Sequence, residues 1–220
     1  MCGRFVLNCS TADILKEFAV DKVLAESTPS YNITPSQRVS AIIKDDSNCL
    51  VQFQWGLIPS WSKDPSIGSK MINARSETLS EKPSFKSSLK KRRCLILANG
   101  FYEWKKEGKY KSPLYIHLKS KKPFGFAGLF DKWISPEGEE IKSCTIITTE
   151  SNELLKPIHN RMPVIIPKDK VALWLNPAIQ NEKQILPVLK QFPSQKMEYY
   201  EVSKTVNSPA NNSPDCIKPV

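Results

Sequence analysis

Histidine is scarce in this chain, and its cysteines are scattered. The 220 residues include two histidines, His117 and His159, and six cysteines, no two of which have the CxxC spacing. This supply argues against a zinc cluster, because structural zinc sites take closely spaced Cys and His ligands. We therefore predict no metal and no cofactor, and free thiols in a reducing intracellular compartment.

Long apolar runs, internal repeats and low-complexity segments are also missing. The N-terminus has no apolar signal-peptide region, and no stretch is long enough to span a membrane. We expect one domain over residues 1–220, acting as a monomer without a membrane partner. Its expected location is the cytoplasm of a bacterium, associated with the nucleoid, or the nucleus of a eukaryote.

Positive charge is in excess. The chain has 32 Lys and Arg against 22 Asp and Glu, a net charge of +10 and a pI near 9.3. Such a balance favours a polyanionic partner, with nucleic acid as the leading candidate. A solvated basic surface with no such partner would give the same composition.

Strand-like runs outnumber helices. We expect strands at 39–44, 49–53, 94–98, 114–118, 124–129, 143–148, 164–166 and 197–202, with hairpin turns at 107–108 and 136–138. Helices are expected after the cap at Ser10 or Thr11, with an apolar face from Ile14 to Ala19, and over 168–175 and 185–189. Residues 206–220 have the composition of a loop. Because many connections are too short for crossover helices, we predict an α+β fold. Its sheet would be mostly antiparallel and curved or barrel-like, with a few peripheral helices.

Cys2 stands directly behind Met1 and before Gly3-Arg4. Aminopeptidases generally remove an initiator Met when the next residue is small, and removal would leave Cys2 with a free α-amine. This 1,2-aminothiol offers two nucleophiles near neutral pH, since the reference pKa is about 7.7–8.0 for the amine and about 8.5 for the thiol. Taken alone, a cysteine at position 2 is also what chance would provide.

Four segments gather polar and aromatic residues at the expected strand ends. They are 1–5 (MCGRF), 55–78 (from WGLIP to INARSET), 98–104 (ANGFYEW) and 158–163 (IHNRMP). In this order they resemble the SOS-response-associated peptidase (SRAP) family, the abasic-site processing proteins. The resemblance covers nearly the whole chain, because it extends through 31–35 (YNITP) and 126–129 (FAGL) to 219–220.

The resemblance implies a reaction with abasic sites in single-stranded DNA. The family bonds its N-terminal cysteine to the ring-opened aldehyde and forms a thiazolidine crosslink that shields the lesion. The α-amine attacks the aldehyde carbon and loses water to give an imine, and the Cys2 thiolate then closes a five-membered ring. An internal cysteine could give only a reversible hemithioacetal. Lyase activity and autoproteolytic N-terminal processing are further activities that the resemblance implies.

Three more residues match the family's active site. Glu103 lies among aromatic residues, where a raised pKa would suit proton transfer, although most glutamates lie on the surface. The Asn73 amide can hold the amine and the sugar oxygen without adding charge, or it can cap a turn. His159 could protonate the departing hydroxyl. His117 fits a packed or edge-strand side chain better, because it lies in an alternating run.

Cationic and aromatic residues near these groups are the predicted DNA contacts. Arginines suit phosphate oxygens, and a threonine hydroxyl could add a contact. Trp and Pro side chains could stack on or wedge between bases, although core packing is the commoner role of Trp. The predicted DNA-binding residues are Arg4, Pro35, Trp61, Arg75, Trp104, Thr148 and Arg161. The basic run 90–93 is expected to be a solvated loop.

Two positions depart from the family's pattern, since Asn99 and Asn160 stand where Asp is common. An amide keeps the hydrogen bonding but loses the charge, which bears on rate and pH optimum more than on the reaction itself.

Three other functions stay open. The Met-Cys-Gly start also resembles class II glutamine amidotransferases, in which Cys2 would be an acyl-transfer nucleophile. A cysteine peptidase using Cys2 and His159 is the second alternative. A single-stranded nucleic-acid binding module without chemistry is the third, and it would bind intact and abasic strands alike.

Overall fold

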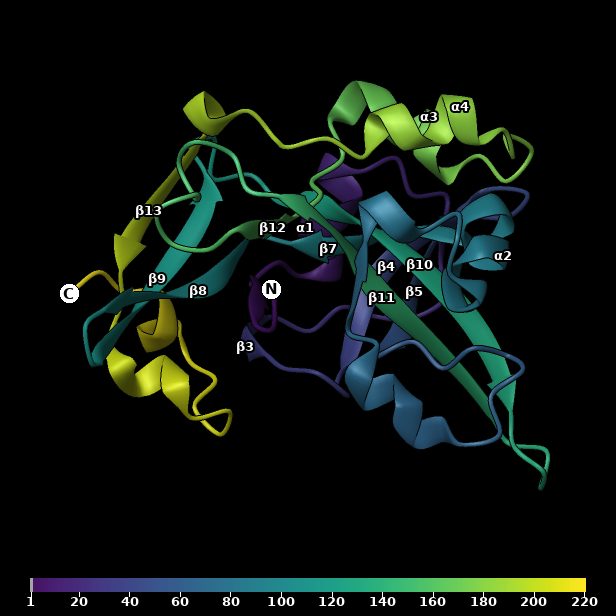
Figure 1. The fold of residues 1–220 in the computed structure, drawn as a ribbon, viewed down its shortest axis with the longest axis horizontal. Helices are drawn as coiled ribbons and strands as arrows, with labels where there is room; N and C mark the ends of the chain where they lie inside the picture. Colours follow the sequence, from purple (N-terminus) through teal and green to yellow (C-terminus); the bar gives the residue numbers. More distant parts are fainter. Residues whose placement is uncertain (1) are drawn as a thin grey trace.

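A computed structural model describes residues 2–220 (Figure 1). Five strands form a closed barrel: β4 (Arg38–Lys44), β5 (Asn48–Trp55), β7 (Arg93–Ala98), β10 (Phe124–Ile134) and β11 (Glu140–Glu150). Their order is β11-β10-β7-β4-β5, with antiparallel neighbours. A parallel pairing of Gln54 with Ser143 joins β5 back to β11 and closes the barrel. The predicted α+β fold with a barrel-like sheet is therefore confirmed.

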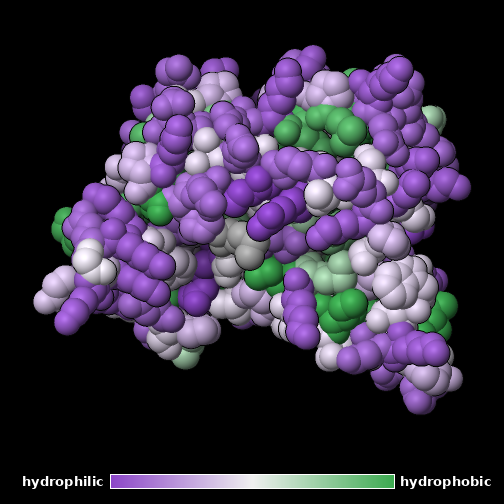
Figure 2. Space-filling view, viewed as in Figure 1, coloured by the Kyte–Doolittle hydropathy of each residue, from purple (hydrophilic) through white to green (hydrophobic). Residues whose placement is uncertain are grey.

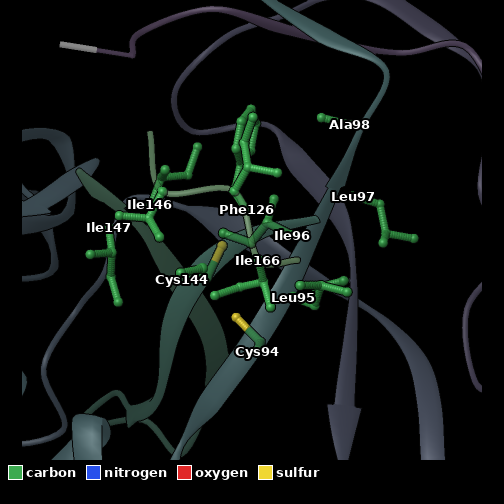
Figure 3. Close-up of a cluster of buried hydrophobic side chains, with 14 of the residues drawn as sticks. Cys94, Leu95, Ile96, Leu97, Ala98, Phe126, Cys144, Ile146, Ile147 and Ile166 are labelled. Carbon is green, nitrogen blue, oxygen red and sulfur yellow. The ribbon is translucent and has the colours of Figure 1, made fainter. Parts of the chain in front are cut away.

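The barrel interior explains the apolar run at 94–98. All six residues of β7 are buried, because one face of the strand points into the barrel and α3 (Val171–Leu175) covers the strand from outside. Figure 3 shows side chains of β7, β10 and β11 meeting inside, with the Cys94 and Cys144 thiols turned toward each other. Gly128 lies in the strand between them. A Cβ there would come within 2.8 Å of the Cys94 sulfur, so the packing requires glycine.

A second sheet holds five strands in the order β13-β9-β8-β1-β3. Their bounds are β13 (Met197–Glu201), β9 (Tyr110–Leu118), β8 (Gly100–Glu107), β1 (Phe5–Leu7) and β3 (Ser30–Ile33). Asn99 alone separates β7 from β8, so the chain passes directly from the barrel into this sheet. The predicted turns are confirmed, since Gly108 and Gly138 have φ of 59° and 88°.

Strand β1 is fixed from both faces. The Phe5 ring packs edge-on against Trp55 and Phe126 in the main core, at centroid distances of 5.1 and 5.7 Å. Val6 points the other way, into a second apolar cluster with Tyr102. These opposed contacts hold β1, a strand of the second sheet, against the barrel.

The helices are short and peripheral. They are α1 (Thr11–Glu17), α2 (Pro83–Lys91), α3 and α4 (Glu182–Ile185), and the remaining strands are β2 (Lys22–Val23), β6 (Asn73–Arg75) and β12 (Arg161–Pro163). Ser10 and Asp13 form the capping box of α1, as the predicted cap required. The predicted apolar face is only half right, because Ile14 is buried whereas Leu15 is 44% exposed. In residues 2–220 no helix combines the length and apolar character needed to cross a bilayer.

Two sequence expectations fail. The strand expected at 164–166 lies instead at β12, and Ile165 forms only an isolated bridge to Phe126. The basic run 90–93 is not a solvated loop. Lys90 and Lys91 end α2, and Arg92 pairs with Asp131 at 3.2 Å. Arg93 is buried and donates to the carbonyls of Leu89, Lys90, Trp174, Asn176 and Ile179.

The segment after Val206 has no regular element longer than a 3-10 turn, yet it is firmly attached. The Asn32 side chain donates to the carbonyls of Val206, Ser208 and Asn211. Cys216 is buried in the second apolar cluster. The predicted loop is therefore part of the packed structure.

Candidate active site and DNA interface

Cys2 lies at the junction of the two sheets. Its side chain is buried, and its carbonyl accepts a hydrogen bond of 2.8 Å from Nδ2 of Asn73. Asn73 begins β6 and pairs with Ile146 of β11. A strand attached to the barrel therefore holds Cys2, shortly before β1 begins. Oδ1 of Asn73 is also buried, and no donor among residues 2–220 reaches it. That oxygen can accept a hydrogen bond from an incoming group.

Glu103 approaches Cys2 from the second sheet. Phe101 pairs with Phe5, and the Tyr102 amide donates to the Arg4 carbonyl, so β8 follows the N-terminal segment residue by residue. Glu103 is 7% exposed, and burial raises its pKa to about 7. Burial also raises the pKa of the Cys2 thiol, and the negative charge of Glu103 adds to this rise. A carboxyl group whose pKa is near neutral therefore lies close to a thiol that burial keeps neutral.

His159 precedes β12 by two residues. Its Nδ1 accepts a 3.0 Å hydrogen bond from the Arg161 amide, so the neutral ring carries its proton on Nε2. Burial lowers the pKa of His159, and the positive charge of Lys106 on β8 also disfavours the protonated ring. His159 thus belongs to the barrel side of the junction and faces the strand that carries Glu103.

Arg4 and Trp104 form one unit. The Arg4 guanidinium lies 5.7 Å from the centre of the Trp104 ring, in cation–π geometry. Nη1 of Arg4 donates to Oδ1 of Asn32 and to the Val206 carbonyl, at 2.7 Å each. Nε1 of Trp104 donates to Asn207. Trp104 is half-buried, so its ring is supported by this network and not enclosed in the core.

The other two predicted arginines lie on two short strands, β6 and β12, that both pair with β11. Arg75 on β6 pairs with Thr148 on β11, and Glu150 on β11 pairs with Arg161 on β12. Arg75 is exposed. Arg161 donates to the Thr148 carbonyl at 2.7 Å and to its hydroxyl at 3.3 Å. Thr148 is buried, so its hydroxyl contacts Arg161, and a direct contact with DNA stays a prediction.

Trp61 and Pro35 lie in two other segments, and the structure does not place Trp61 beside the arginines. Trp61 is 60% exposed, in a loop whose neighbours Ser60 and Ser62 bind Asp131 and Trp133 near the far end of β10. Pro35 follows β3 at the end that pairs with Phe5, beside the N-terminal segment. A stacking or wedging role for either residue stays a prediction.

Sequence reasoning missed two polar residues that hold the predicted arginines. Asn32 binds Arg4, and Glu77 binds Arg161 through two hydrogen bonds of 2.7 and 2.9 Å. Both residues lie inside the motifs at 31–35 and 72–78, and this position is the sequence signal that could have identified them. The structure also accounts for Asn99 in place of the family's usual Asp. Its Oδ1 accepts a 3.0 Å hydrogen bond from the backbone N–H of Asn8, and a carboxylate oxygen would accept the same bond. Asn160 is exposed.

Other parts of the described chain offer less chemistry. No cluster of three or more His, Cys, Asp or Glu residues among residues 2–220 could hold a metal ion. A cavity of about 730 Å³ lies between α1, α3 and the start of β10, and none of the predicted site residues lines it. The face seen in Figure 2 is mostly hydrophilic, with hydrophobic residues in separate patches.

A sequence model of the family "SOS response associated peptidase (SRAP)" matches residues 1–209. The chain belongs to the SRAP family. "Abasic site processing protein YoqW" of Bacillus subtilis is 50% identical over 99% of this chain and 99% of its own length. "Abasic site processing protein HMCES" of Xenopus tropicalis is 36% identical, over 86% of this chain and 65% of its own length.

The fold of this chain is similar to that of solved structures. A crystal structure of a protein from Bacteroides thetaiotaomicron matches the whole of both chains with a TM-score of 0.90 at 28% identity. Family membership confirms the resemblance drawn from the four motifs. Three of those motifs meet at the junction through Cys2, Asn73 and Glu103, and the fourth supplies His159, whose Nδ1 accepts from the Arg161 amide.

Proposed function

We propose that this SRAP protein recognises abasic sites in single-stranded DNA and bonds them covalently to Cys2 as a thiazolidine after Met1 is removed. The observation that carries the proposal is the environment of Cys2. Asn73 holds its carbonyl, and a carboxyl group with a pKa of about 7 lies beside its thiol. A cysteine with only a packing role needs neither contact. The relatives are named abasic site processing proteins, which supports abasic DNA as the substrate.

The first steps use the amine. Glu103 transfers protons that open the cyclic hemiacetal of the sugar to the aldehyde. The Cys2 amine then bonds to the aldehyde carbon, with Asn73 Oδ1 positioned to accept from an N–H group. Addition gives a carbinolamine, whose hydroxyl accepts a hydrogen bond from Nε2–H of His159. One proton passes from the nitrogen to this hydroxyl, which leaves as water, and a neutral imine remains.

Ring closure uses the thiol. Because burial keeps the Cys2 thiol neutral, its proton must be removed as the sulfur–carbon bond forms, and the Glu103 carboxylate can accept it. The imine nitrogen gains a proton in the same closure. The net reaction joins the aldehyde to the amine and the thiol and releases one water molecule, with no oxidation or reduction.

The same electrostatics argue against a thiol peptidase as the main activity. Such an enzyme depends on a thiolate paired with a protonated histidine. Here burial raises the pKa of Cys2 and lowers that of His159, which is opposite to the pattern that such a pair requires. We propose lyase and peptidase activities only as secondary ones.

DNA binding would use the rim of the junction. Arg4, Arg75 and Arg161 suit phosphates on either side of the lesion, and Trp104 offers an aromatic face for a neighbouring base. The net charge of +10 favours this partner. We propose that the protein binds single strands as a monomer, inside the cell.

The deciding experiment compares three proteins against one abasic oligonucleotide, scored by intact mass. They are the parent, Cys2→Ala, and a form with an uncleaved residue before Cys2. The parent should gain the mass of the DNA aldehyde less one water, and the other two should form no stable adduct. An equally stable adduct in the extended form would rule out the aminothiol mechanism. Glutamine hydrolysis without an adduct would instead favour the alternative function, a class II glutamine amidotransferase.

A further inference from the structure

Glu77 holds Arg161 in a bidentate ion pair. Nη1 and Nη2 of Arg161 donate to Oε1 and Oε2 of Glu77 at 2.7 and 2.9 Å. The Arg161 side chain is 12% exposed and that of Glu77 is 45% exposed. Arg161 is also bound to Thr148, so its position is fixed while its carboxylate partner faces solvent. The arginine is thus mostly buried beneath a solvent-facing carboxylate, and its charge is already compensated.

A compensated arginine is a poor phosphate ligand. The end-on edge of the guanidinium, with which arginine binds phosphate in two-point fashion, is occupied by the carboxylate. A DNA phosphate must displace Glu77 or share Arg161 with it. The ion pair lowers the pKa of Glu77, so the carboxylate stays charged at neutral pH.

We propose that Glu77 competes with DNA phosphate for Arg161 and so weakens the reversible binding of undamaged single strands. The inference rests on the proposed DNA function. A protein that captures its lesion covalently does not need tight reversible binding. Weak binding leaves it free to leave intact DNA, which is in large excess over abasic sites.

The chain offers a matched control. Glu150 is exposed and lies on β11, where it pairs with Arg161 across the two strands. The side-chain hydrogen bonds of Arg161 go instead to Glu77 and Thr148. Glu150→Gln removes the same charge from the same region. Any general gain in attraction for DNA should therefore appear in both variants, whereas release of Arg161 should appear only in Glu77→Gln.

The test measures binding of an intact single-stranded oligonucleotide over a range of salt concentrations. For Glu77→Gln we expect affinity roughly fivefold higher than for Glu150→Gln. The slope of log K against log salt should steepen by about 0.7, the value for one additional phosphate contact on a single strand. Arg161→Ala in the Glu77→Gln protein should abolish both gains.

The other outcomes of this test would contradict the proposal. Equal behaviour of Glu77→Gln and Glu150→Gln, or a gain that survives Arg161→Ala, would overturn the role of Glu77. Weaker binding by a folded Glu77→Gln protein, checked by its melting temperature, would make Glu77 a support for Arg161 and would also overturn the proposal. A parent protein that binds no single-stranded DNA would overturn the proposed function itself. That failure is visible before any variant is compared.

Discussion

The side-chain amide of Asn73 on β6 donates to the main-chain carbonyl of Cys2, so a strand attached to the barrel fixes the residue that leads into the second sheet. We predict that Asn73→Ala slows crosslink formation about fivefold to tenfold, the effect of losing one positioning hydrogen bond of about 1 kcal/mol. Single-turnover rates on denaturing gels measure this. Affinity for an intact strand should be nearly unchanged, and an unchanged crosslinking rate would contradict the role of Asn73.

Glu103 should make both activity and stability depend on pH. Burial raises its pKa from 4.5 to about 7, so the folded protein binds this proton more tightly than the unfolded chain does. Stability should then be full below about pH 4.5, fall as the pH rises toward 7, and stay constant above that, with a total loss on the order of 3 kcal/mol.

Glu103→Gln removes this titration. The variant should melt higher than the parent at pH 8 but not at pH 4.5, and its crosslinking should be slow and lack the parent's step near pH 7. Glu107→Gln, at the exposed end of the same strand, is the control for a surface carboxylate. A parent whose melting temperature does not change relative to Glu103→Gln over this range would show that Glu103 titrates normally.

His159 should act on the chemical steps and not on binding. Because its Nδ1 accepts from the Arg161 amide, Nε2 carries the proton that it can donate. We predict that His159→Ala slows formation or reversal of the crosslink while affinity for intact DNA stays within about twofold. His159→Gln, whose amide also donates, should retain part of the activity. Rates equal to those of the parent in both directions would contradict this role.

Arg75 should bind phosphate without regard to the lesion. It is exposed on β6, beside the strand that carries Thr148. Arg75→Ala should weaken binding of intact and abasic strands about equally and flatten the salt dependence by about 0.7 per lost contact. A loss confined to abasic strands would assign Arg75 to the chemistry instead.

The parts of the fold that the sequence predicted are those with strong local signals. The barrel strand at 94–98 is a continuous buried run, and the hairpins at Gly108 and Gly138 need a positive φ. Strand β1 has only three residues, and β6 and β12 are equally short, so they depend on pairing with distant strands. The environment of Arg93 was predicted wrongly because three of its carbonyl partners, those of Trp174, Asn176 and Ile179, lie 81, 83 and 86 residues away in the sequence.

The site was predicted as a set of residue types but not as a network. The motifs gave Cys2, Asn73, Glu103 and His159, since few residues can perform the chemistry. Partners such as Asn32 and Glu77 could not be assigned, because their contacts span 28 and 84 residues of sequence. A hydrogen bond between residues so far apart produces no periodic pattern in the sequence.

The bond from Arg4 to the Val206 carbonyl has a consequence for biosynthesis, since it joins residues 202 positions apart. A ribosome must make nearly the whole protein before Arg4 can reach its final partners, and contacts of such long range form slowly. During that interval the N-terminal segment is still open to processing enzymes, whereas Cys2 is buried once the chain has folded. On the proposed mechanism, we therefore expect Met1 to be removed before the site around Cys2 is complete.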